Sequence, residues 1–536
     1  MTPRAFWLLL AGCSAAATAP PEPADVTADT PALAPLAGPI WFTTDTARHP
    51  ELPGGVYGVA IADYDADGDQ DIVFAVDGKR LLLLRNLGAG TFEDATALVG
   101  LGRNSRGAAG VVWVDVDGDG RLDLFVTRRY DTNFLFLQET PGVFTDVSAA
   151  WGLDIKRVYE GASFADLDRD GDLDVFLSVN NDPDRDEDPW EPGLNGSPDV
   201  ALRNDGDRFT DVTEAWNLAT NPTGETYGSV IFDMDGVFAP DIFVVHDYVM
   251  DEFWRNDGSG HFSREPTWGT TEFSGLMGLD AADFDGDGYL DIFSTDWGPD
   301  QLKFGGPPDT FPFADGFPEL LGEASDPTAS LTGWGCAFLD VDNDQDSDLI
   351  EVAAFANDRN ELRDGGLRIL ENLGLGRLPG TLVDRSDTAG PPFLIRLNGY
   401  GLSTGDLDGD GDSDVVLGIG PLEKGIPGGP DLETRSLILY NQGTQGAGNH
   451  VLDVDLDQQS SKNRFGVGAR VSVTVGDRVQ TQVVLAGSSY LSSIGPRLRF
   501  GLGKSTHAAV LRVVWPDGAE SATSDVAAGV IKVTRP

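Results

Sequence analysis

The sequence predicts an all-β protein, a seven-bladed β-propeller followed by a small C-terminal β domain. Three observations lead to this prediction. A nine-residue acidic loop flanked by strand-forming residues recurs seven times, at intervals of 50 to 67 residues. Apolar stretches ending in Asn-x-Gly follow several of these loops, as in tight hairpins. After about Gly446 the acidic loop no longer occurs, and shorter alternating stretches take over.

The composition is that of a globular protein with a strong negative charge. Of the 536 residues, 40% are hydrophobic, which is enough for a packed core. The formal net charge is -50, from 87 acidic and 37 basic residues. Nucleic acid binding needs basic patches, which we do not find in this sequence, so we expect no nucleic acid partner. Cations or basic partners are favoured instead.

The first acidic loop, Asp63–Asp71, has carboxylates at alternate positions. Such carboxylates repel one another unless a cation neutralises them, and Ca²⁺, which takes six to eight oxygen ligands, is suited to this. A single copy is equally well explained as a solvated acidic turn. Seven copies at blade-sized intervals favour calcium. The loops, numbered 1 to 7, begin at Asp63, Asp115, Asp166, Asp233, Asp283, Asp340 and Asp406.

Positions one, three, five and nine of six loops are Asp, and we expect their carboxylates to bind Ca²⁺. They are Asp63, Asp65, Asp67 and Asp71; Asp115, Asp117, Asp119 and Asp123; Asp166, Asp168, Asp170 and Asp174; Asp283, Asp285, Asp287 and Asp291; Asp340, Asp342, Asp344 and Asp348; and Asp406, Asp408, Asp410 and Asp414. Position seven varies, which predicts a ligand from the backbone carbonyl. The residues there are Asp69, Arg121, Asp172, Tyr289, Asp346 and Asp412.

Two loops depart from this pattern. Position six is Gly in five of the six loops, as a sharp left-handed turn requires, and Gln345 is the exception. We therefore expect a strained or looser site in loop 6. Loop 4 keeps only three acids and has apolar residues between them, so we expect it to bind metal weakly or not at all. Its acids are Asp233, Asp235 and Asp241, with Val237, Ala239 and Pro240 in the middle. The sequence thus predicts about six calcium sites.

The EF-hand has the same spacing of acids, but its context is absent. An EF-hand places a bidentate Glu at position twelve and has helices on both sides of the loop. Here strand formers flank every loop, and position twelve holds residues such as Phe74, Ser294 and Leu417. These residues exclude the EF-hand.

Each repeat is interpreted as strand, acidic loop, strand, strand, Asn-Gly turn and strand, which is a four-stranded antiparallel blade. The Asn and the Gly are expected to take the positive φ of a tight turn. The outermost strand begins with a recurring phrase, seen in Phe92–Thr96 and Phe144–Ser148. A similar phrase, Trp41–Asp45, stands alone before loop 1. We expect it to complete the last blade beside Leu437–Asn441 and to close the ring.

Both parts of the chain resemble known families. The loops are similar to the FG-GAP or VCBS repeats of integrin α-subunits and bacterial surface proteins, which implies a seven-bladed propeller with calcium in its loops over roughly residues 38–445. Residues 446–536 resemble the ASPIC/UnbV domain, which follows the propeller in the cartilage acidic protein family. Four signatures carry this second resemblance, in the family's order: Asn463–Arg470, Gly487–Ser492, Phe500–Gly503 and Trp515–Gly518.

The N-terminus predicts a lipoprotein. Residues 1–13 contain Arg4, a short apolar run and Leu10-Ala11-Gly12-Cys13, which resembles a bacterial lipobox. The resemblance implies cleavage before Cys13 and lipidation of its thiol. A plain secretory signal or a misplaced start codon is the alternative. Residues 14–37, rich in Ala, Pro and Thr, are expected to be a disordered tether. The predicted location is extracytoplasmic, either lipid-anchored to the bacterial outer membrane or cell surface, or secreted.

No catalytic constellation is evident in the sequence. The five histidines form no paired metal spacing, and the sequence around Ser488 and Ser489 lacks the flanking pattern of a nucleophile elbow. With Cys13 assigned to the lipid, Cys336 cannot form an intramolecular disulfide, and its apolar surroundings predict a buried, unreactive thiol.

The sequence therefore favours an extracytoplasmic, calcium-binding β-propeller that acts as a binding or adhesion module at the cell envelope over an enzyme. The expected partner is an envelope or extracellular protein or a glycan, with the membrane reached through the lipid. The alternative is an extracellular enzyme or lectin acting on glycan or lipid, through the propeller face or the inserted loops.

Three insertions interrupt the repeats. Asn180–Val200, with Trp190, is either a recognition loop or a solvated acidic flap. Gly305–Pro327 carries Phe311, Phe313 and Phe317, which either bind a partner or pack onto the propeller. Gly420–Glu433 is rich in Gly and Pro and is expected to be flexible.

Overall fold

The computed structural model describes residues 40–181, 196–218, 224–266, 275–307, 314–315, 317–321, 331–354, 356–358, 361–363, 365–374, 381–421, 432–443 and 448–536. The predictions for Cys13, the tether, Trp190, Phe311 and Phe313 lie outside these ranges, as does most of each insertion. None of the helices in the described part is long and apolar enough to cross a membrane.

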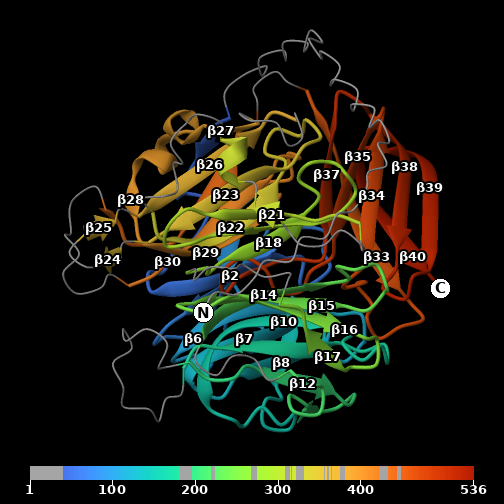
Figure 1. Ribbon diagram of the computed structural model, residues 1–536. Helices are drawn as coiled ribbons and strands as arrows, with labels where there is room; N and C mark the ends of the chain where they lie inside the picture. Colours follow the sequence, from blue (N-terminus) through green and yellow to red (C-terminus); the bar gives the residue numbers. More distant parts are fainter. Residues whose placement is uncertain are drawn as a thin grey trace, which may run out of the picture. The chain divides into compact units, whose positions relative to one another are not determined.

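Seven four-stranded antiparallel blades form the ring, which confirms the predicted propeller (Figure 1). The strands of blades 2 and 3 are joined in one eight-stranded sheet, and the sheet of blade 1 contains a fifth strand. Each blade is numbered after its acidic loop, which joins its first two strands. Blade 1 consists of β2 (Val56–Ala62), β3 (Asp71–Val76), β4 (Leu82–Asn86) and β5 (Phe92–Asp94), and blade 2 of β6 (Ala108–Val114), β7 (Asp123–Asp131), β8 (Phe134–Thr140) and β9 (Val143–Asp146). Blade 3 consists of β10 (Arg157–Ala165), β11 (Asp174–Val179), β12 (Val200–Asn204) and β13 (Phe209–Asp211), and blade 4 of β14 (Glu225–Phe232), β15 (Asp241–Asp247), β16 (Glu252–Asn256) and β17 (Phe262–Arg264).

Blades 5 to 7 repeat the same order. Blade 5 consists of β18 (Leu279–Ala282), β19 (Asp291–Ser294), β20 (Gln301–Phe304) and β21 (Ala314–Asp315), and blade 6 of β22 (Gly333–Leu339), β23 (Asp348–Ala353), β26 (Gly366–Asn372) and β27 (Leu382–Asp384). Blade 7 consists of β29 (Gly399–Gly405), β30 (Asp414–Ile419), β32 (Leu437–Asn441) and β1 (Phe42–Thr43). The first strands contact one another in cyclic order, from β2 through β6, β10, β14, β18, β22 and β29 back to β2. The second strands are mostly buried, and β3 is buried along its whole length, because neighbouring blades cover both faces of the sheet.

The first strand of the described chain closes the ring, as the sequence predicts. In β1, Phe42 pairs with Asn441 and Thr43 with Tyr440 of β32. Phe42 is fully buried and packs on Phe393, with 5.5 Å between ring centroids. The pairing joins the two ends of the propeller sequence in one blade and removes two exposed sheet edges.

Short elements decorate the blades. They are two small strand pairs, β24 (Ala356–Asp358) with β25 (Glu361–Arg363) and β28 (Arg396–Leu397) with β31 (Leu432–Glu433), one helix, α1 (Phe317–Leu320), and two 3-10 turns, Ser386–Thr388 and Pro391–Leu394. Phe317 is buried and its ring lies 5.6 Å from that of Phe293. This aromatic residue of the second insertion therefore packs onto the propeller.

The C-terminal part contains two further sheets, β37-β33-β40 and β35-β34-β38-β39. Strand β33 pairs with β40 in parallel, and the other pairs within these sheets are antiparallel. The strands are β33 (His450–Gln458), β34 (Arg470–Val475), β35 (Arg478–Val483), β37 (Leu498–Gly503), β38 (His507–Val514), β39 (Glu520–Ala527) and β40 (Gly529–Arg535).

Residues 486–494, here called the axial segment, run from the C-terminal part into the centre of the ring. They contact the first strand of every blade, which places them on the propeller axis. Strand β36 (Ser493–Ile494) pairs in parallel with β2. The contacts with blades 1 to 7, in order, are Val59 N to Ser492 Oγ at 3.2 Å, Val111 N to Leu491 O at 3.1 Å, Phe164 N to Ala486 O at 2.8 Å, the ring of Tyr227 to that of Tyr490 at 6.0 Å, Ser489 N to Leu279 O at 2.6 Å, Cys336 N to Ser489 Oγ at 3.0 Å, and Ser403 Oγ to Ser493 O at 2.8 Å.

Candidate metal sites

The backbone of each acidic loop turns sharply around its first carboxylate. In loop 1 the carboxylate of Asp63 accepts the backbone N–H groups of Asp67 and Gly68, both at 3.0 Å. Gly68 has φ +102°, a region in which only glycine is unstrained. Gln345 occupies the same position of loop 6 with φ +87°. Loop 6 therefore carries the backbone strain that the sequence predicts for it.

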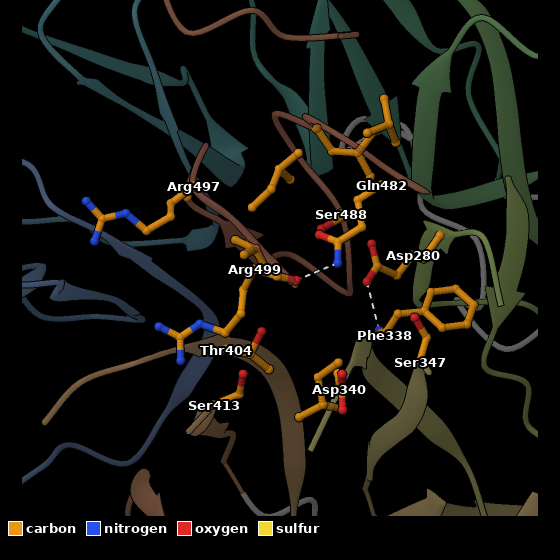
Figure 2. Close-up of a pocket in the computed structure, with 18 of the residues that line it drawn as sticks. Asp280, Phe338, Asp340, Ser347, Thr404, Ser413, Gln482, Ser488, Arg497 and Arg499 are labelled. Carbon is orange, nitrogen blue, oxygen red and sulfur yellow. Dashed lines mark hydrogen bonds between the residues drawn. The ribbon is translucent and has the colours of Figure 1, made fainter. Parts of the chain in front are cut away.

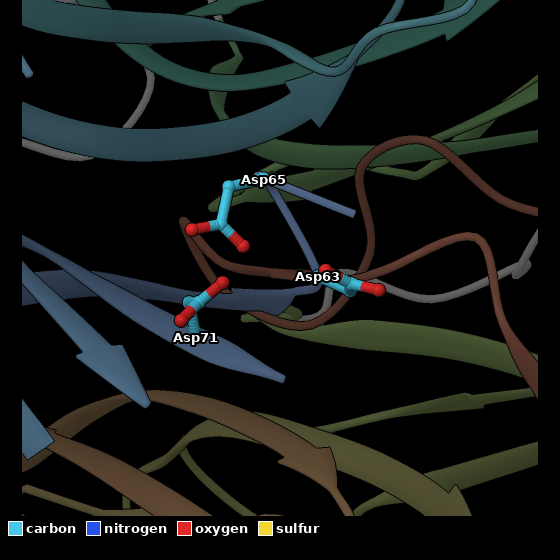
Figure 3. A group of neighbouring side chains, drawn as sticks. All are labelled: Asp63, Asp65 and Asp71. Atoms are coloured by element: carbon cyan, nitrogen blue, oxygen red, sulfur yellow. The ribbon is translucent and has the colours of Figure 1, made fainter. Parts of the chain in front are cut away.

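This turn brings three carboxylates together. Oxygen atoms of Asp63, Asp65 and Asp71 lie within 4.8 Å of one another (Figure 3). The equivalent acids at positions one, three and nine converge in the same way in loops 2 to 5. They are Asp115, Asp117 and Asp123; Asp166, Asp168 and Asp174; Asp233, Asp235 and Asp241; and Asp283, Asp285 and Asp291.

The carboxylate at position five lies outside these groups. That of Asp67 accepts the backbone N–H of Asp69 at 3.1 Å, and that of Asp119 accepts the N–H of Arg121 at 2.9 Å. These hydrogen bonds fix the turn that presents the carbonyl of position seven. A direct metal contact at position five stays a prediction.

Several loop carboxylates have buried oxygen atoms that accept no hydrogen bond. They include Oδ1 of Asp65, Asp166, Asp168, Asp172, Asp283, Asp346 and Asp408. A buried acceptor without a donor is costly, and a carboxylate more so. Burial raises the pKa of Asp63 to about 6 and that of Asp166 to about 7, so these groups favour protonation when no cation is present. Those at positions one and three, in loops 1, 3, 5 and 7, fit a hard divalent cation such as Ca²⁺.

The acid at position nine also has a structural task. Asp71 is fully buried and accepts the backbone N–H groups of Tyr64, at 3.3 Å, and Asn86, at 2.8 Å. Burial raises its pKa to about 9. It thus ties loop 1 to the third strand of its own blade. The same pair of hydrogen bonds recurs at Asp123, Asp174, Asp241, Asp291, Asp348 and Asp414.

The Asn of the Asn-x-Gly turns links neighbouring blades, which the sequence did not reveal. The amide of Asn86 donates to Gln70 O at 3.0 Å in its own loop and to Leu407 O at 2.8 Å in loop 7. The expected positive φ is found at Gly88 and not at Asn86, so that part of the prediction is wrong. The equivalent links to the preceding loop are Gln138 to Tyr64, Asn204 to Val116, Asn256 to Leu167, Asn372 to Phe284 and Asn441 to Val341.

Cationic side chains of the C-terminal part contact the carboxylates of three of the loops. Lys462 Nζ lies 2.8 Å from Asp172 in loop 3, and Arg478 Nη1 lies 3.4 Å from Asp346 in loop 6. Both acids are at position seven, so their side chains are free of the metal contact predicted for their carbonyls. Arg499 bonds the carboxylate of Asp406 in loop 7 at 3.0 Å. The C-terminal part therefore covers the loop face of the propeller.

A small cavity of about 100 Å³ lies between the loops and the C-terminal part (Figure 2). On one side, Asp280 accepts the N–H of Phe338 at 2.9 Å, and burial raises the pKa of this acid to about 7. The side-chain amide of Gln482 donates to Arg499 O at 2.6 Å. One residue pair further along, the side chain of Gln480 donates to Gly501 O at 2.8 Å. Pockets for small ligands are typically 300 Å³ or more, so this cavity has room for water only.

Cys336 is buried, as predicted, and burial raises the pKa of its thiol well above the ordinary value. His246 is fully buried, with Nδ1 3.0 Å from the hydroxyl of Thr226. Neither residue is part of an acidic loop.

Comparison with known proteins agrees with both parts of the fold. A model of the FG-GAP-like repeat matches residues 63–126, 115–177 and 239–294, and a model described as ASPIC and UnbV matches residues 459–533. Cartilage acidic protein 1 of Homo sapiens is 26% identical over 88% of this chain and 70% of its own length. The protein of that name from Mus musculus is 25% identical, over 90% and 74%.

Among solved structures, the BP39L lectin from Burkholderia pseudomallei resembles this chain with a TM-score of 0.45 and 15% identity, over 68% of this chain and 93% of the lectin. This likeness is too weak to bear on ligands. The sequence matches are more informative, because they follow the loops and the C-terminal signatures in order. The chain combines FG-GAP-like repeats with an ASPIC and UnbV domain and is homologous to the cartilage acidic protein 1 family.

Proposed function

We propose that this chain is an extracytoplasmic, calcium-binding β-propeller that serves as a binding or adhesion module at the cell envelope. The observation that carries the calcium assignment is the repeated convergence of three carboxylates with buried oxygens that lack donors. When bound, calcium neutralises the carboxylates at positions one, three and nine and so stabilises the loop that joins the first two strands of a blade. Attachment to the membrane through a lipid on Cys13 belongs to the same proposal.

The partner surface is proposed to lie on the face opposite the acidic loops, because the C-terminal part covers the loop face. The first strands begin at this opposite face, and aromatic side chains stand at their starts. Tyr57, Tyr227 and Trp334 are partly exposed there. The ring of Tyr400 lies 5.2 Å from that of Tyr57 and 4.9 Å from that of Trp334. Aromatic rings clustered in this way favour a glycan or protein partner.

Trp334 supports the glycan form of this proposal. Its ring is partly exposed, and an exposed aromatic face can stack against the apolar face of a sugar. An active site on the axis is less favoured, because the axial segment fills the centre of the ring. A lectin is therefore the second candidate, ahead of an enzyme.

Binding of the calcium-loaded protein to an array of envelope glycans tests this proposal. We expect signals that Trp334→Ala abolishes and Trp41→Ala preserves, since Trp41 is exposed just before the strand that closes the ring, away from the axis. Equal glycan binding by both variants would show that the partner surface does not include Trp334. No binding to any glycan, together with calcium-dependent binding to a purified envelope protein, would select the protein partner.

A further inference from the structure

Two arginine side chains contact loop 4. The carboxylate of Asp235 is nearly fully buried and accepts a hydrogen bond from Arg255 Nε at 2.5 Å. From the C-terminal part, Arg470 Nη2 donates to the carbonyl of Asp233 at 3.0 Å. Two guanidinium groups thus lie next to this loop and offset part of its negative charge.

The equivalent position in blade 1 shows the difference. Arg85 precedes Asn86 as Arg255 precedes Asn256, and its Nε lies 3.3 Å from Asp65 Oδ2. Arg85 Nε nevertheless makes no hydrogen bond, and Asp65 Oδ1 also has no partner. Within the described residues, no carboxylate oxygen of loop 4 is buried without a donor. The three acids of loop 4 converge as those of loop 1 do, but only loop 1 has a buried carboxylate oxygen without a donor.

The middle of loop 4 forms an apolar contact instead. Phe238 occupies position six, where five other loops have glycine, and holds φ +61°. A non-glycine residue keeps this conformation only where its surroundings fix it. Its ring lies against Gly518, so closely that a Cβ on Gly518 would be 3.0 Å from Cδ2 of Phe238. Phe238 and Pro516 also line the same groove, of about 280 Å³.

The partner of Phe238 is one of the C-terminal signatures. In Trp515–Gly518 the N–H of Gly518 donates to Trp515 O at 2.8 Å, and Gly518 has φ +82°. The turn therefore presents a bare Cα, the flattest surface that a chain offers to an aromatic ring. The ring of Phe238 and the bare Cα of Gly518 are both apolar, and the flat ring lies against a residue without a side chain.

We propose that loop 4 is not a calcium site and instead serves as the docking contact of the propeller for the C-terminal turn Trp515–Gly518. The replacement of Asp and Gly at positions five and six by Val237 and Phe238 is the change that converts a metal loop into a domain contact. The metal half of this inference rests on the proposed calcium binding by the other loops. The docking half does not.

Calcium stoichiometry tests the metal half. The double variant Asp233→Asn/Asp235→Asn is expected to bind as many calcium ions as the parent in equilibrium dialysis, whereas the matched loop 5 variant Asp283→Asn/Asp285→Asn loses one. Loss of one ion from the loop 4 variant would overturn the inference.

The variant Val237→Asp/Phe238→Gly restores the Asp at position five and the Gly at position six. We expect it to bind one calcium ion more than the parent, and an unchanged number of ions would contradict the assigned role of these two residues. A parent that binds no calcium would defeat the proposed function itself.

Hydrogen exchange tests the docking half without reference to calcium. Phe238→Ala should speed amide exchange in residues 515–519 about tenfold, on the order expected when a half-buried aromatic contact is lost. Val237→Ala is the control, since this neighbouring side chain is also exposed and its Cβ is retained. Equal exchange in the two variants would show that Phe238 does not hold the turn.

Discussion

The hydroxyl of Tyr490 accepts a hydrogen bond from Nη2 of Arg129 at 3.1 Å, inside the ring of blades. Arg129 also binds Glu160 through two hydrogen bonds, of 2.8 and 2.6 Å. One residue of the C-terminal part is thus joined to a buried ion pair between blades 2 and 3. The axial segment is consequently part of the propeller core, although it lies more than 300 residues from these strands in the sequence.

Removal of the Tyr490 hydroxyl should destabilise the whole molecule. Tyr490→Phe leaves the ring in place but deprives Arg129 of one acceptor, so we expect a loss of about 0.5–1.5 kcal/mol in the free energy of unfolding. Tyr490→Ala should cost about 3–5 kcal/mol because it also leaves a cavity. Tyr130→Phe, at an exposed position, is the control. Denaturant unfolding measures all three, and a Tyr490→Ala variant as stable as the parent would refute the axial role.

The link between blades can be broken at a single amide. Asn86→Ala leaves the carbonyls of Gln70 and Leu407 without their donor, and we expect a loss of about 1–3 kcal/mol. Asn104→Ala, on an exposed turn, should change stability by less than about 0.5 kcal/mol. Thermal melts of the two variants make the comparison, and equal melting temperatures would show that the Asn bridges do not hold the ring.

Arg499 should be among the most sensitive cations of the C-terminal part. It bonds Asp453 twice, at 2.9 and 2.8 Å, and also Asp406 and the carbonyl of Gly411. Arg499→Met removes the cation that Asp453 and Asp406 share in a mostly buried place, which typically costs about 3–5 kcal/mol.

The exposed pair Arg512–Glu520 provides the matched control for Arg499. Arg512→Met should cost less than about 1 kcal/mol, because exposed ion pairs contribute little. Chemical denaturation of both variants measures the two losses in the free energy of unfolding. Similar losses in the two would mean that Arg499 does not anchor the C-terminal part to loop 7.

Without calcium, stability should fall as the pH rises. Burial raises the pKa of Asp63 to about 6 and that of Asp115 and Asp166 to about 7, whereas an unfolded Asp titrates near about 3.9. Between these values the folded state binds more protons than the unfolded state, so the free energy of unfolding decreases from about pH 4 to pH 7. Calcium holds the same carboxylates ionised and removes this penalty.

Melting curves at pH 5, 6, 7 and 8 measure this linkage, in buffer freed of calcium by a chelating resin and again with calcium added. The stabilisation by calcium should grow with pH. A calcium-free protein whose melting temperature increases from pH 5 to pH 8 would contradict the assignment of these acids.

The repeated features could be read from the sequence, because each depends on residues close together in the chain. The loops, the blades and the closing strand at Phe42 follow from local patterns of acids, apolar runs and turns. The degeneracy of loop 4 and the strain at Gln345 were also visible, as departures from an otherwise regular pattern.

The remaining features depend on contacts that no local pattern encodes. Gly487–Ser492 has no strand periodicity, so its place on the axis could not be derived. The hydrogen bond from Asn86 to Leu407 joins residues that are 321 positions apart in the sequence. Only the recurrence of the Asn at one position of the repeat signalled a shared role. The exposed ring of Phe238 was likewise uninformative without its partner Gly518.

Calorimetric melting of the full chain with saturating calcium and with excess EDTA, at pH 7.5, tests the central claim most directly. Each occupied loop should stabilise the fold by RT ln(1 + [Ca]/Kd), about 2.7 kcal/mol when calcium is at one hundred times Kd. With several loops occupied, we predict a large fall in melting temperature on chelation, restored by calcium and not by magnesium. The same melting temperature in EDTA and in calcium would contradict the assignment of the acidic loops as calcium sites.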